Sequence, residues 1–250
     1  MLGVFAAFAF QRWPSGAQTA TAWALACAAA GTLIVAVLAW LVTTHNALVD
    51  LDHDIAAWGI EHADDVGRSL LRTVTRLGST EVVVIALVVV GVIQLVRMPS
   101  VRLATFIVAI GAGEWLLTRE VKDLVDRARP TVTAGAAALG AAFPSGHTAG
   151  TAAVYTAIAL VLGIGLTRRT RATLLGVAFA LGVAVAASRV LLGVHWLSDV
   201  VGGLALGWGW CALCVAVSGR ALFDQPDRGG AVGDMELAHD GRHVGADGGG

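Results

Sequence analysis

The stretch Ala20–Val42, with the sequence ATAWALACAAAGTLIVAVLAWLV, contains no charged residue and decides the class of fold. A helix that crosses the hydrocarbon core of a bilayer needs roughly 20 mostly apolar residues, and this run reaches that length. The runs Thr148–Thr167 and Val200–Gly219 are equally free of charge. The sequence therefore predicts an all-α membrane protein.

The composition of the whole chain favours the same class. Of its 250 residues, 56% are hydrophobic and 14% are charged, whereas a typical soluble domain carries about 25% charged residues. These values argue against a soluble globular enzyme, and the net charge of -1 argues against a nucleic-acid partner. Cys27, Cys211 and Cys214 all lie inside apolar runs, so they predict neither a disulfide framework nor a zinc site. We expect no metal, no cofactor and no obligate protein partner.

Three less regular apolar runs complete a predicted bundle of six transmembrane helices: Val82–Val96, Leu103–Thr118 and Ala172–Ser188. The first is long enough if its flanking residues Glu81 and Arg97 lie at the membrane interfaces, and the third is slightly short but uncharged. The second is interrupted by Glu114. An ionisable side chain inside a span is costly and usually faces the bundle or a polar cavity. We therefore expect Glu114 to face protein and not lipid.

The placement of arginines predicts how the bundle is oriented in the plasma membrane. Arg12 precedes the first span, and five more arginines lie in the turns after the second and fourth spans: Arg97, Arg102, Arg168, Arg169 and Arg171. By the positive-inside rule these positions are cytoplasmic, as are both termini. Three segments then face outward: 45–80, 119–147 and 189–199.

The chain divides into one domain and two flanking segments. Residues 1–19 are predicted to be a cytoplasmic N-terminal segment and residues 20–219 the six-span domain. No basic region precedes the apolar stretch Leu2–Phe10, so it does not resemble a secretory signal peptide. Residues 220–250 are rich in Gly, Asp and Arg, which cannot bury enough apolar area to offset the entropy of ordering. We predict a disordered cytoplasmic tail.

The first outward segment contains an amphipathic pattern. Arg68, Arg72 and Arg76 recur every four residues, with apolar side chains between them: Leu70, Leu71, Val74 and Leu77. This spacing predicts a helix with one basic and one apolar face. Such a helix can lie at the membrane interface and extend its arginine side chains toward water. Alternatively, it can form the rim of a site that attracts an anionic lipid head group.

The second outward segment begins with a cluster of charges and ends at Pro130. Lys122 and Arg129 are two helical turns apart, so both can project from one face and chelate a multiply charged anion. Pro130 disfavours helix at the residue before it. The alternative is that the charges only pair at four-residue spacing, Arg119 with Asp123 or Lys122 with Asp126.

The stretch Phe143–His147, with the sequence FPSGH, directly precedes the fourth span. Ser145 at a helix start, followed by Gly146, leaves unpaired backbone N–H groups that can bind an anion in the positive end of the helix dipole. His147 would lie beside the same anion. A structural histidine at the membrane interface is the competing interpretation.

The third outward segment contains His195 and Asp199, four residues apart. If the sixth helix begins near Val194, the two side chains share a face, and Asp199 can accept the ring proton of His195. That hydrogen bond would fix the tautomer and leave the other ring nitrogen free to attack an electrophile. A buried structural His–Asp pair has the same pattern.

The predicted topology brings all of these polar residues to one side of the membrane: Lys122, Arg129, Ser145, His147, Arg189, His195 and Asp199. Cations, histidines and a carboxylate at one face of a bundle indicate phosphoryl chemistry, which depends mostly on positioning and charge neutralisation. The sequence contains no P-loop and no dinucleotide-binding fingerprint.

Three motifs in this order resemble the signatures of the type 2 phosphatidic acid phosphatase superfamily. They are Lys122 through Arg129-Pro130, Pro144 through His147, and Ser188-Arg189 through His195 and Asp199. The resemblance covers about residues 50–217. Two parts of the first outward segment are also similar to this family, namely Asp52 with Ile55 and Trp58, and 75–79.

The resemblance implies a metal-independent lipid phosphatase of the bacterial integral-membrane branch. In that family pattern, His195 forms a phosphohistidine, Asp199 orients it and His147 protonates the leaving oxygen. The phosphate oxygens would be held by five residues: Lys122, Arg129, Ser145, Gly146 and Arg189. Water would then cleave the phosphoenzyme.

The resemblance also implies a class of substrate, namely a phosphate or diphosphate of a membrane lipid at the extracytoplasmic face. We favour a polyprenyl diphosphate such as undecaprenyl diphosphate, with phosphatidylglycerophosphate and phosphatidate as alternatives. Two other classes stay open. The motifs are similar to those of vanadium haloperoxidases, which are soluble, and a non-enzymatic lipid carrier or scramblase is compatible with the membrane fold alone.

Overall fold

The computed structural model describes residues 17–44, 47–62, 64–130 and 140–218, and all regular structure in these ranges is helical. Five helical segments are long and apolar enough to cross a membrane. They are α2 (Ala17–Val42), α5 (Thr80–Arg97), a composite of α6 (Val101–Val108), the π-helical turn η1 (Ala109–Gly113) and α7 (Glu114–Val125), α9 (Arg168–Leu191) and α10 (Leu197–Ser218). Most of the predicted 1–19 segment and all of the predicted 220–250 tail lie outside the described residues.

The sixth predicted span is an apolar helix, α8 (Gly146–Leu162), which has only 17 residues. It ends before the predicted boundary at Thr167 because Gly163 follows its last residue and Gly165 adopts a left-handed conformation with φ of 74°. All six predicted runs are therefore helical, and five of them reach the length of a membrane span.

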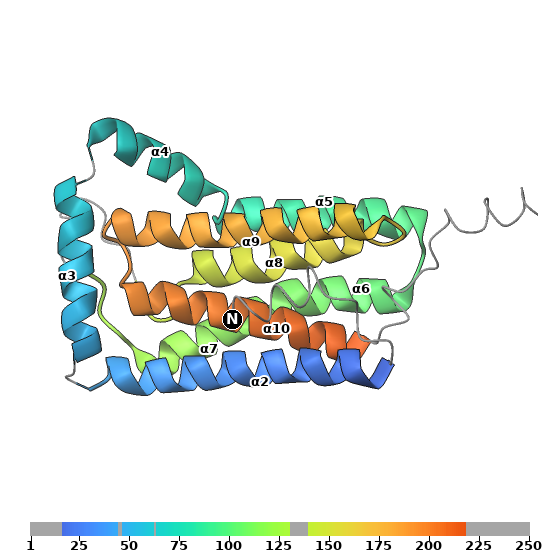
Figure 1. The fold of residues 1–250 in the computed structure, drawn as a ribbon, viewed down its shortest axis with the longest axis horizontal. Helices are drawn as coiled ribbons and strands as arrows, with labels where there is room; N and C mark the ends of the chain where they lie inside the picture. Colours follow the sequence, from blue (N-terminus) through green and yellow to red (C-terminus); the bar gives the residue numbers. More distant parts are fainter. Residues whose placement is uncertain (1–16, 45–46, 63, 131–139, 219–250) are drawn as a thin grey trace, which may run out of the picture.

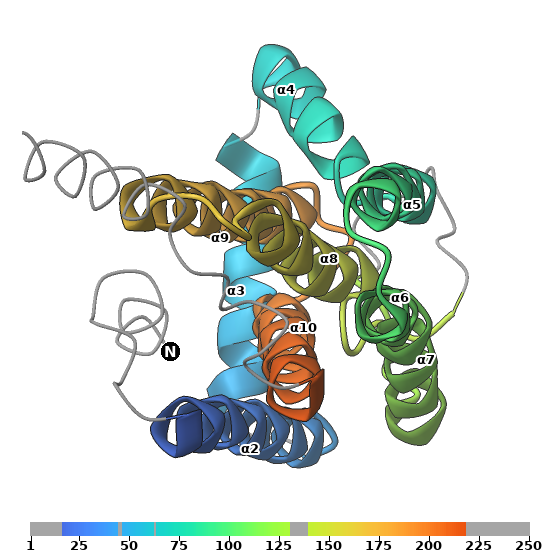
Figure 2. The same cartoon turned by 90° about the vertical axis from the view of Figure 1, so that its right-hand side faces the viewer.

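Helix α8 lies at the centre of the bundle, with α9, α10 and α5 packed around it and α7 beside its N-terminal half (Figure 2). Most of its residues are buried, and they are small: Ala149, Gly150, Thr151, Ala152 and Ala153 occupy five consecutive buried positions. Small side chains let helix backbones approach closely where no hydrophobic effect drives association. Helix α2 packs on the outer side of α10.

The contact between α8 and α10 depends on glycines of α10. A Cβ atom at Gly207 would lie 2.3 Å from the carbonyl oxygen of Ala149 and 2.8 Å from Cβ of Ala152. A Cβ atom at Gly203 would lie 2.7 Å from the carbonyl oxygen of Ser145. No larger side chain fits these positions without moving a backbone. The glycines thus hold the N-terminal turn of α8 against the first turns of α10.

Two helices lie outside the transmembrane runs. Helix α3 (Ala47–His62) crosses one end of the bundle, and α4 (Asp65–Arg76) lies beside that end (Figure 1). The amphipathic helix predicted from the arginine spacing is α4, which begins after the N-cap Asp64, whose carboxylate accepts from the N–H of Gly67. Its basic face is largely solvent-exposed and its other side packs against α9.

Glu114 begins α7 directly after the π-helical turn η1. Its residue is 8% exposed, and its Oε1 atom accepts a hydrogen bond of 2.8 Å from the hydroxyl of Thr118. The expectation that Glu114 faces protein is confirmed.

Gly207→Ala is expected to lower the free energy of unfolding by about 1–3 kcal/mol, because the added methyl group must displace the backbone of α8. The measurement is the thermal unfolding midpoint of the detergent-purified protein. Gly176→Ala is the matched control, because a Cβ atom there meets nothing within 4 Å. Equal midpoints for the two variants would contradict the close α8–α10 contact.

Candidate active site

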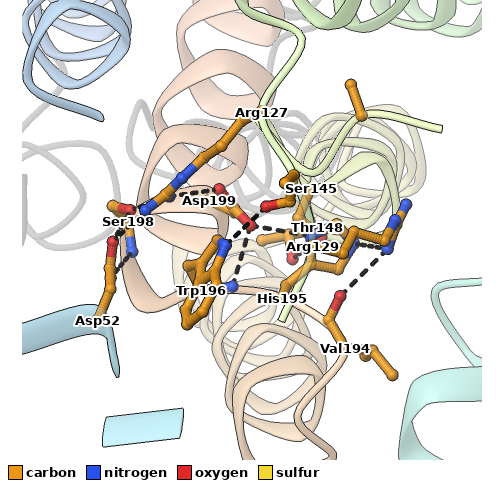
Figure 3. Close-up of polar contacts among 12 residues, drawn as sticks. Asp52, Arg127, Arg129, Ser145, Thr148, Val194, His195, Trp196, Ser198 and Asp199 are labelled. Carbon is orange, nitrogen blue, oxygen red and sulfur yellow. Dashed lines mark hydrogen bonds and ion pairs between the residues drawn. The ribbon is translucent and has the colours of Figure 1, made fainter. Parts of the chain in front are cut away.

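The His195–Asp199 pair forms at the start of α10. The helix begins at Leu197 and not near Val194, because Gly193 has a positive φ of 65° and His195 lies in the turn before the helix. Even so, Nδ1 of His195 lies 3.2 Å from Oδ2 of Asp199 (Figure 3). The backbone N–H of Trp196 donates to the same oxygen at 2.9 Å. The predicted pairing is therefore present without a shared helical face.

The hydrogen bonds of His195 define its tautomer. An Nη1 atom of Arg129 lies 3.0 Å from Nε2 of His195 and 3.1 Å from the carbonyl oxygen of Val194. Because a guanidinium only donates, Nε2 is the acceptor and the ring proton is on Nδ1, facing Asp199. The pKa of His195 is lowered to about 4, chiefly by burial and to a smaller extent by the charges of Arg129 and Arg189, while Asp199 acts in the opposite direction. His195 is thus neutral at physiological pH.

Lys122 and Arg129 do not lie on one helical face, which corrects the prediction from their spacing. Helix α7 ends at Val125, because Asp126 adopts a left-handed conformation with φ of 42° and turns the chain. Aspartate tolerates this region better than most residues do. Lys122 donates from Nζ to the carbonyl oxygen of Ala141 at 2.6 Å, and both cations still line one cavity.

The alternative pairing of charges on α7 holds for one of the two pairs. Nε of Arg119 lies 4.0 Å from Oδ2 of Asp123 in an exposed ion pair. Lys122 and Asp126 interact only through the backbone, where the N–H of Asp126 donates to the carbonyl oxygen of Lys122. Lys122 therefore keeps its ammonium group at the cavity.

The N-terminus of α8 follows the predicted motif. Ser145 is the N-cap, and its hydroxyl accepts a hydrogen bond of 3.0 Å from the hydroxyl of Thr148 and caps no backbone N–H. Its own backbone N–H donates to the carbonyl oxygen of Asp199 at 3.0 Å, which fixes α8 to α10. Gly146 and His147 line the cavity, whereas Ser145 is fully buried behind them.

Arg189 lies in the last turn of α9, and its guanidinium group is only partly hydrogen-bonded. Its Nη1 atom donates to the hydroxyl of Thr75 at 3.2 Å, and its Nε atom is buried with no hydrogen-bond partner among the residues that the structure describes. Thr75 is held near α8 and α9 because the turn after α4 packs closely there: a Cβ atom at Gly78 would lie 2.6 Å from Cγ1 of Val185. A buried unpaired donor costs free energy. The Nε atom of Arg189 is thus prepared to bind an acceptor.

These side chains surround a cavity of about 720 Å³ between α5, η1, α7 and α8. Its polar end is lined by cations and histidines: Lys122, Arg129, His147, Arg189 and His195. Its other end is lined by aliphatic side chains of α5 and α6, among them Val84, Val88 and Val108, which are about half or more exposed at the bundle surface. The cavity therefore joins a cationic pocket to an apolar groove.

A buried ion cluster behind His195 was not predicted from the sequence. Arg127 donates from Nη1 to Oδ1 of Asp199 and from Nη2 to Oδ2 of Asp52, both at 2.8 Å. It also donates to the hydroxyl of Ser198 at 2.6 Å, and that hydroxyl donates to Asp52. Both carboxylates are fully buried. Arg127 thus neutralises the carboxylate that holds His195 and connects it to α3.

The only feature of the sequence that points to a role for Arg127 is its position inside the motif that runs from Lys122 to Pro130. Its partners are distant, since Asp52 is separated from it by 75 positions and Asp199 by 72. No local periodicity connects residues at such separations. Asp52 belongs to an outward segment whose sequence resembles that of the same family, but its contacts with Arg127 and Ser198 are evident only from the fold.

Within the described ranges, no group of three or more His, Cys, Asp or Glu side chains could hold a metal ion. The polar donors of the cavity are instead mostly cations, and cations suit an anionic ligand. The fold and the site together define a polytopic membrane protein with a cationic pocket that opens onto an apolar groove.

Comparison with known proteins gives the family. Residues 101–222 match the PAP2 superfamily, so the chain carries a PAP2 superfamily domain. It is 27% identical over 164 residues to phosphatidylglycerophosphatase B of Bacillus subtilis (strain 168), covering 65% of this chain and 80% of that protein. It is 36% identical over 113 residues to lipid A 1-phosphatase of Rhizobium etli, covering 41% of this chain and 44% of that protein.

Comparison of the fold with solved structures also indicates a PAP2-type protein. The chain superposes on the crystal structure of a transmembrane PAP2-type phosphatidylglycerolphosphate phosphatase from Bacillus subtilis with a TM-score of 0.69. The two are 26% identical, and the match covers 75% of this chain and 93% of that one. The chain thus carries a PAP2 superfamily domain in a membrane fold that is similar to that of a PAP2-type phosphatase, as its motifs indicated.

Arg127→Met is expected to lower the free energy of unfolding by about 3–5 kcal/mol, because it leaves Asp52 and Asp199 buried without their cation. The measurement is denaturation of the purified protein in detergent. Arg119→Met is the control and should change the free energy by less than about 0.5 kcal/mol, because its ion pair is exposed. Equal losses for the two variants would contradict the ion cluster.

Proposed function

We propose that this protein is a membrane lipid phosphatase that hydrolyses a lipid phosphate through a phosphohistidine on His195. The observation that carries the proposal is the neutral ring of His195, whose Nδ1 proton faces Asp199 and whose Nε2 lone pair faces the cationic pocket. Such a nitrogen can attack phosphorus, while Asp199 stabilises the positive charge that the ring acquires. The lipid chain would lie in the apolar groove of the same cavity.

The cations of the pocket bind the phosphate and neutralise the charge that develops on its oxygens. Arg129 now donates to Nε2 of His195, so a bound phosphate oxygen has to accept that donor and free the lone pair for attack. Arg189 offers its unpaired Nε atom, and Lys122 and the N–H groups at the start of α8 add further donors. Ser145 supports that helix start through Thr148.

His147 is proposed to protonate the leaving lipid oxygen. Burial and the charge of Arg189 lower its pKa to about 4, and the negative charge of the bound phosphate opposes this shift, so that His147 takes up its proton when the substrate binds. It lies in the first turn of α8 and lines the same cavity as His195. Bond formation between Nε2 and phosphorus then accompanies cleavage of the phosphoester bond, with the proton of His147 passing to the lipid alcohol. In the second step His147 accepts a proton from water, which attacks the phosphohistidine and releases inorganic phosphate.

His195→Gln is expected to reduce phosphate release from lipid phosphates by at least roughly a thousandfold while the protein stays folded, because glutamine cannot act as the nucleophile. The assay uses detergent-purified protein in excess EDTA, with phosphatidylglycerophosphate, undecaprenyl diphosphate and phosphatidate as substrates. His62→Gln is the control, because His62 is exposed on α3. Retention of activity in the His195 variant would refute the mechanism, and loss of wild-type activity in EDTA would refute metal independence.

We further propose that the cavity opens on the outer side of the plasma membrane, with the α8–α9 turn on the inner side. The support is the group of arginines at that turn, Arg168, Arg169 and Arg171, at the opposite end of α9 from Arg189. Both termini would then be cytoplasmic.

The orientation predicts which positions an impermeant thiol reagent can reach in intact cells. In a background without Cys27, Cys211 and Cys214, Ser69→Cys on α4 should be labelled and Arg169→Cys should not, although both positions are exposed. The readout is labelling before and after permeabilisation, which should expose Arg169→Cys. Labelling of Arg169→Cys alone in intact cells would invert the topology.

A further inference from the structure

Glu114 is an acidic side chain in the wall of the cavity that the proposed mechanism does not use. Its Oε1 atom accepts from Thr118, and no hydrogen bond to its Oε2 atom is made by any residue that the structure describes. Glu114 and Thr118 both line the cavity. An ionisable residue at membrane depth is costly and usually serves a function. The Oε2 atom is therefore available to a molecule in the cavity.

The register between α7 and α8 gives the position of Oε2 relative to the phosphate pocket. A Cβ atom at Gly150 would lie 3.6 Å from Oε2 of Glu114, and one at Gly146 would lie 3.5 Å from Cγ2 of Thr118. Gly146 begins α8, and four helical residues correspond to about 6 Å along the axis. The carboxyl group thus lies one helical turn from the proposed phosphate site, on the side of the apolar groove.

At this distance from the phosphate, Glu114 would lie beside the first few carbon atoms of the alcohol to which the phosphate is esterified. Most of the groove around Glu114 is lined by aliphatic side chains and glycine, including Val83, Leu87, Gly111 and Val154. A purely hydrocarbon alcohol would leave Oε2 without a partner and desolvated, which costs free energy. A hydroxyl group satisfies a carboxyl group in either protonation state, because it both donates and accepts.

We propose that Glu114 is a specificity-determining residue that hydrogen-bonds a free hydroxyl on the carbon next to the phosphoester carbon of the substrate. This inference rests on the proposed function and deepens it, because it selects lipid phosphomonoesters of glycerol type with a free middle hydroxyl. Polyprenyl diphosphates and diacylated phosphatidate lack that group. Recognition by Glu114 thus disfavours the polyprenyl diphosphate that the sequence analysis favoured.

The test uses two single-chain lipids, a hexadecyl glycerol ether phosphate with its middle hydroxyl free and the deoxy analogue that lacks only this hydroxyl. Wild-type protein should prefer the hydroxyl lipid by roughly tenfold or more in kcat/KM. Glu114→Leu should lose most of this preference while keeping its kcat/KM for the deoxy lipid. Glu114→Gln should retain much of it, because an amide still accepts and donates.

Glu120→Leu is the matched control, an exposed acidic residue of the same helix, and it should keep the wild-type preference. An unchanged preference in Glu114→Leu, an equal loss on both lipids or no preference in the wild type would overturn the inference. If Glu114→Leu does not fold, Thr118→Val tests the same point, because loss of the hydrogen bond that orients the carboxyl group should weaken the preference. Absence of phosphate release from both lipids, by folded wild-type protein that hydrolyses another lipid phosphate, would also overturn the inference, whereas absence of release from every lipid phosphate tested would refute the proposed function.

Discussion

The site depends on the buried carboxylate of Asp199. Three donors meet on it: the guanidinium of the distant Arg127, and the ring of His195 and the backbone N–H of Trp196 from the turn before α10. Through Arg127 the same cluster includes Asp52 of α3, so a helix outside the membrane is fastened to the start of α10. A buried charge without its partner is strongly destabilising, so this cluster couples the position of His195 to the integrity of the fold.

The packing of the helices also joins a polar pocket and an apolar groove in one cavity. Glycines of α10 bring the start of α8 against the start of α10, so His147 and His195 reach one cavity. The cavity then continues along aliphatic side chains of α5 and α6. A lipid phosphatase needs both parts, since the phosphate must leave water for a cationic pocket while the chain remains in an apolar environment.

Features that depend on nearby residues, such as helices and short motifs, could be predicted from the sequence. Contacts between residues far apart in the chain became evident only from the fold. Charge-free runs predicted the helices, and the short motifs predicted the His195–Asp199 pair and the helix start at Ser145. The expectation that Lys122 and Arg129 share a helical face failed, because the left-handed Asp126 ends α7 early. The links from Arg127 to Asp52 and from Arg189 to Thr75 span 75 and 114 positions. Such contacts leave no pattern in a single sequence.

The proposed mechanism requires that His195 becomes covalently phosphorylated. The most direct measurement is rapid quenching of the purified protein with a lipid phosphate labelled at phosphorus, followed by alkaline digestion and mass spectrometry of the peptide that contains His195. We predict a phosphate on His195 that is stable in base, is lost in acid, and forms and decays at rates compatible with turnover. Full turnover with no phosphorylated histidine, or with the phosphate on another residue, would contradict it.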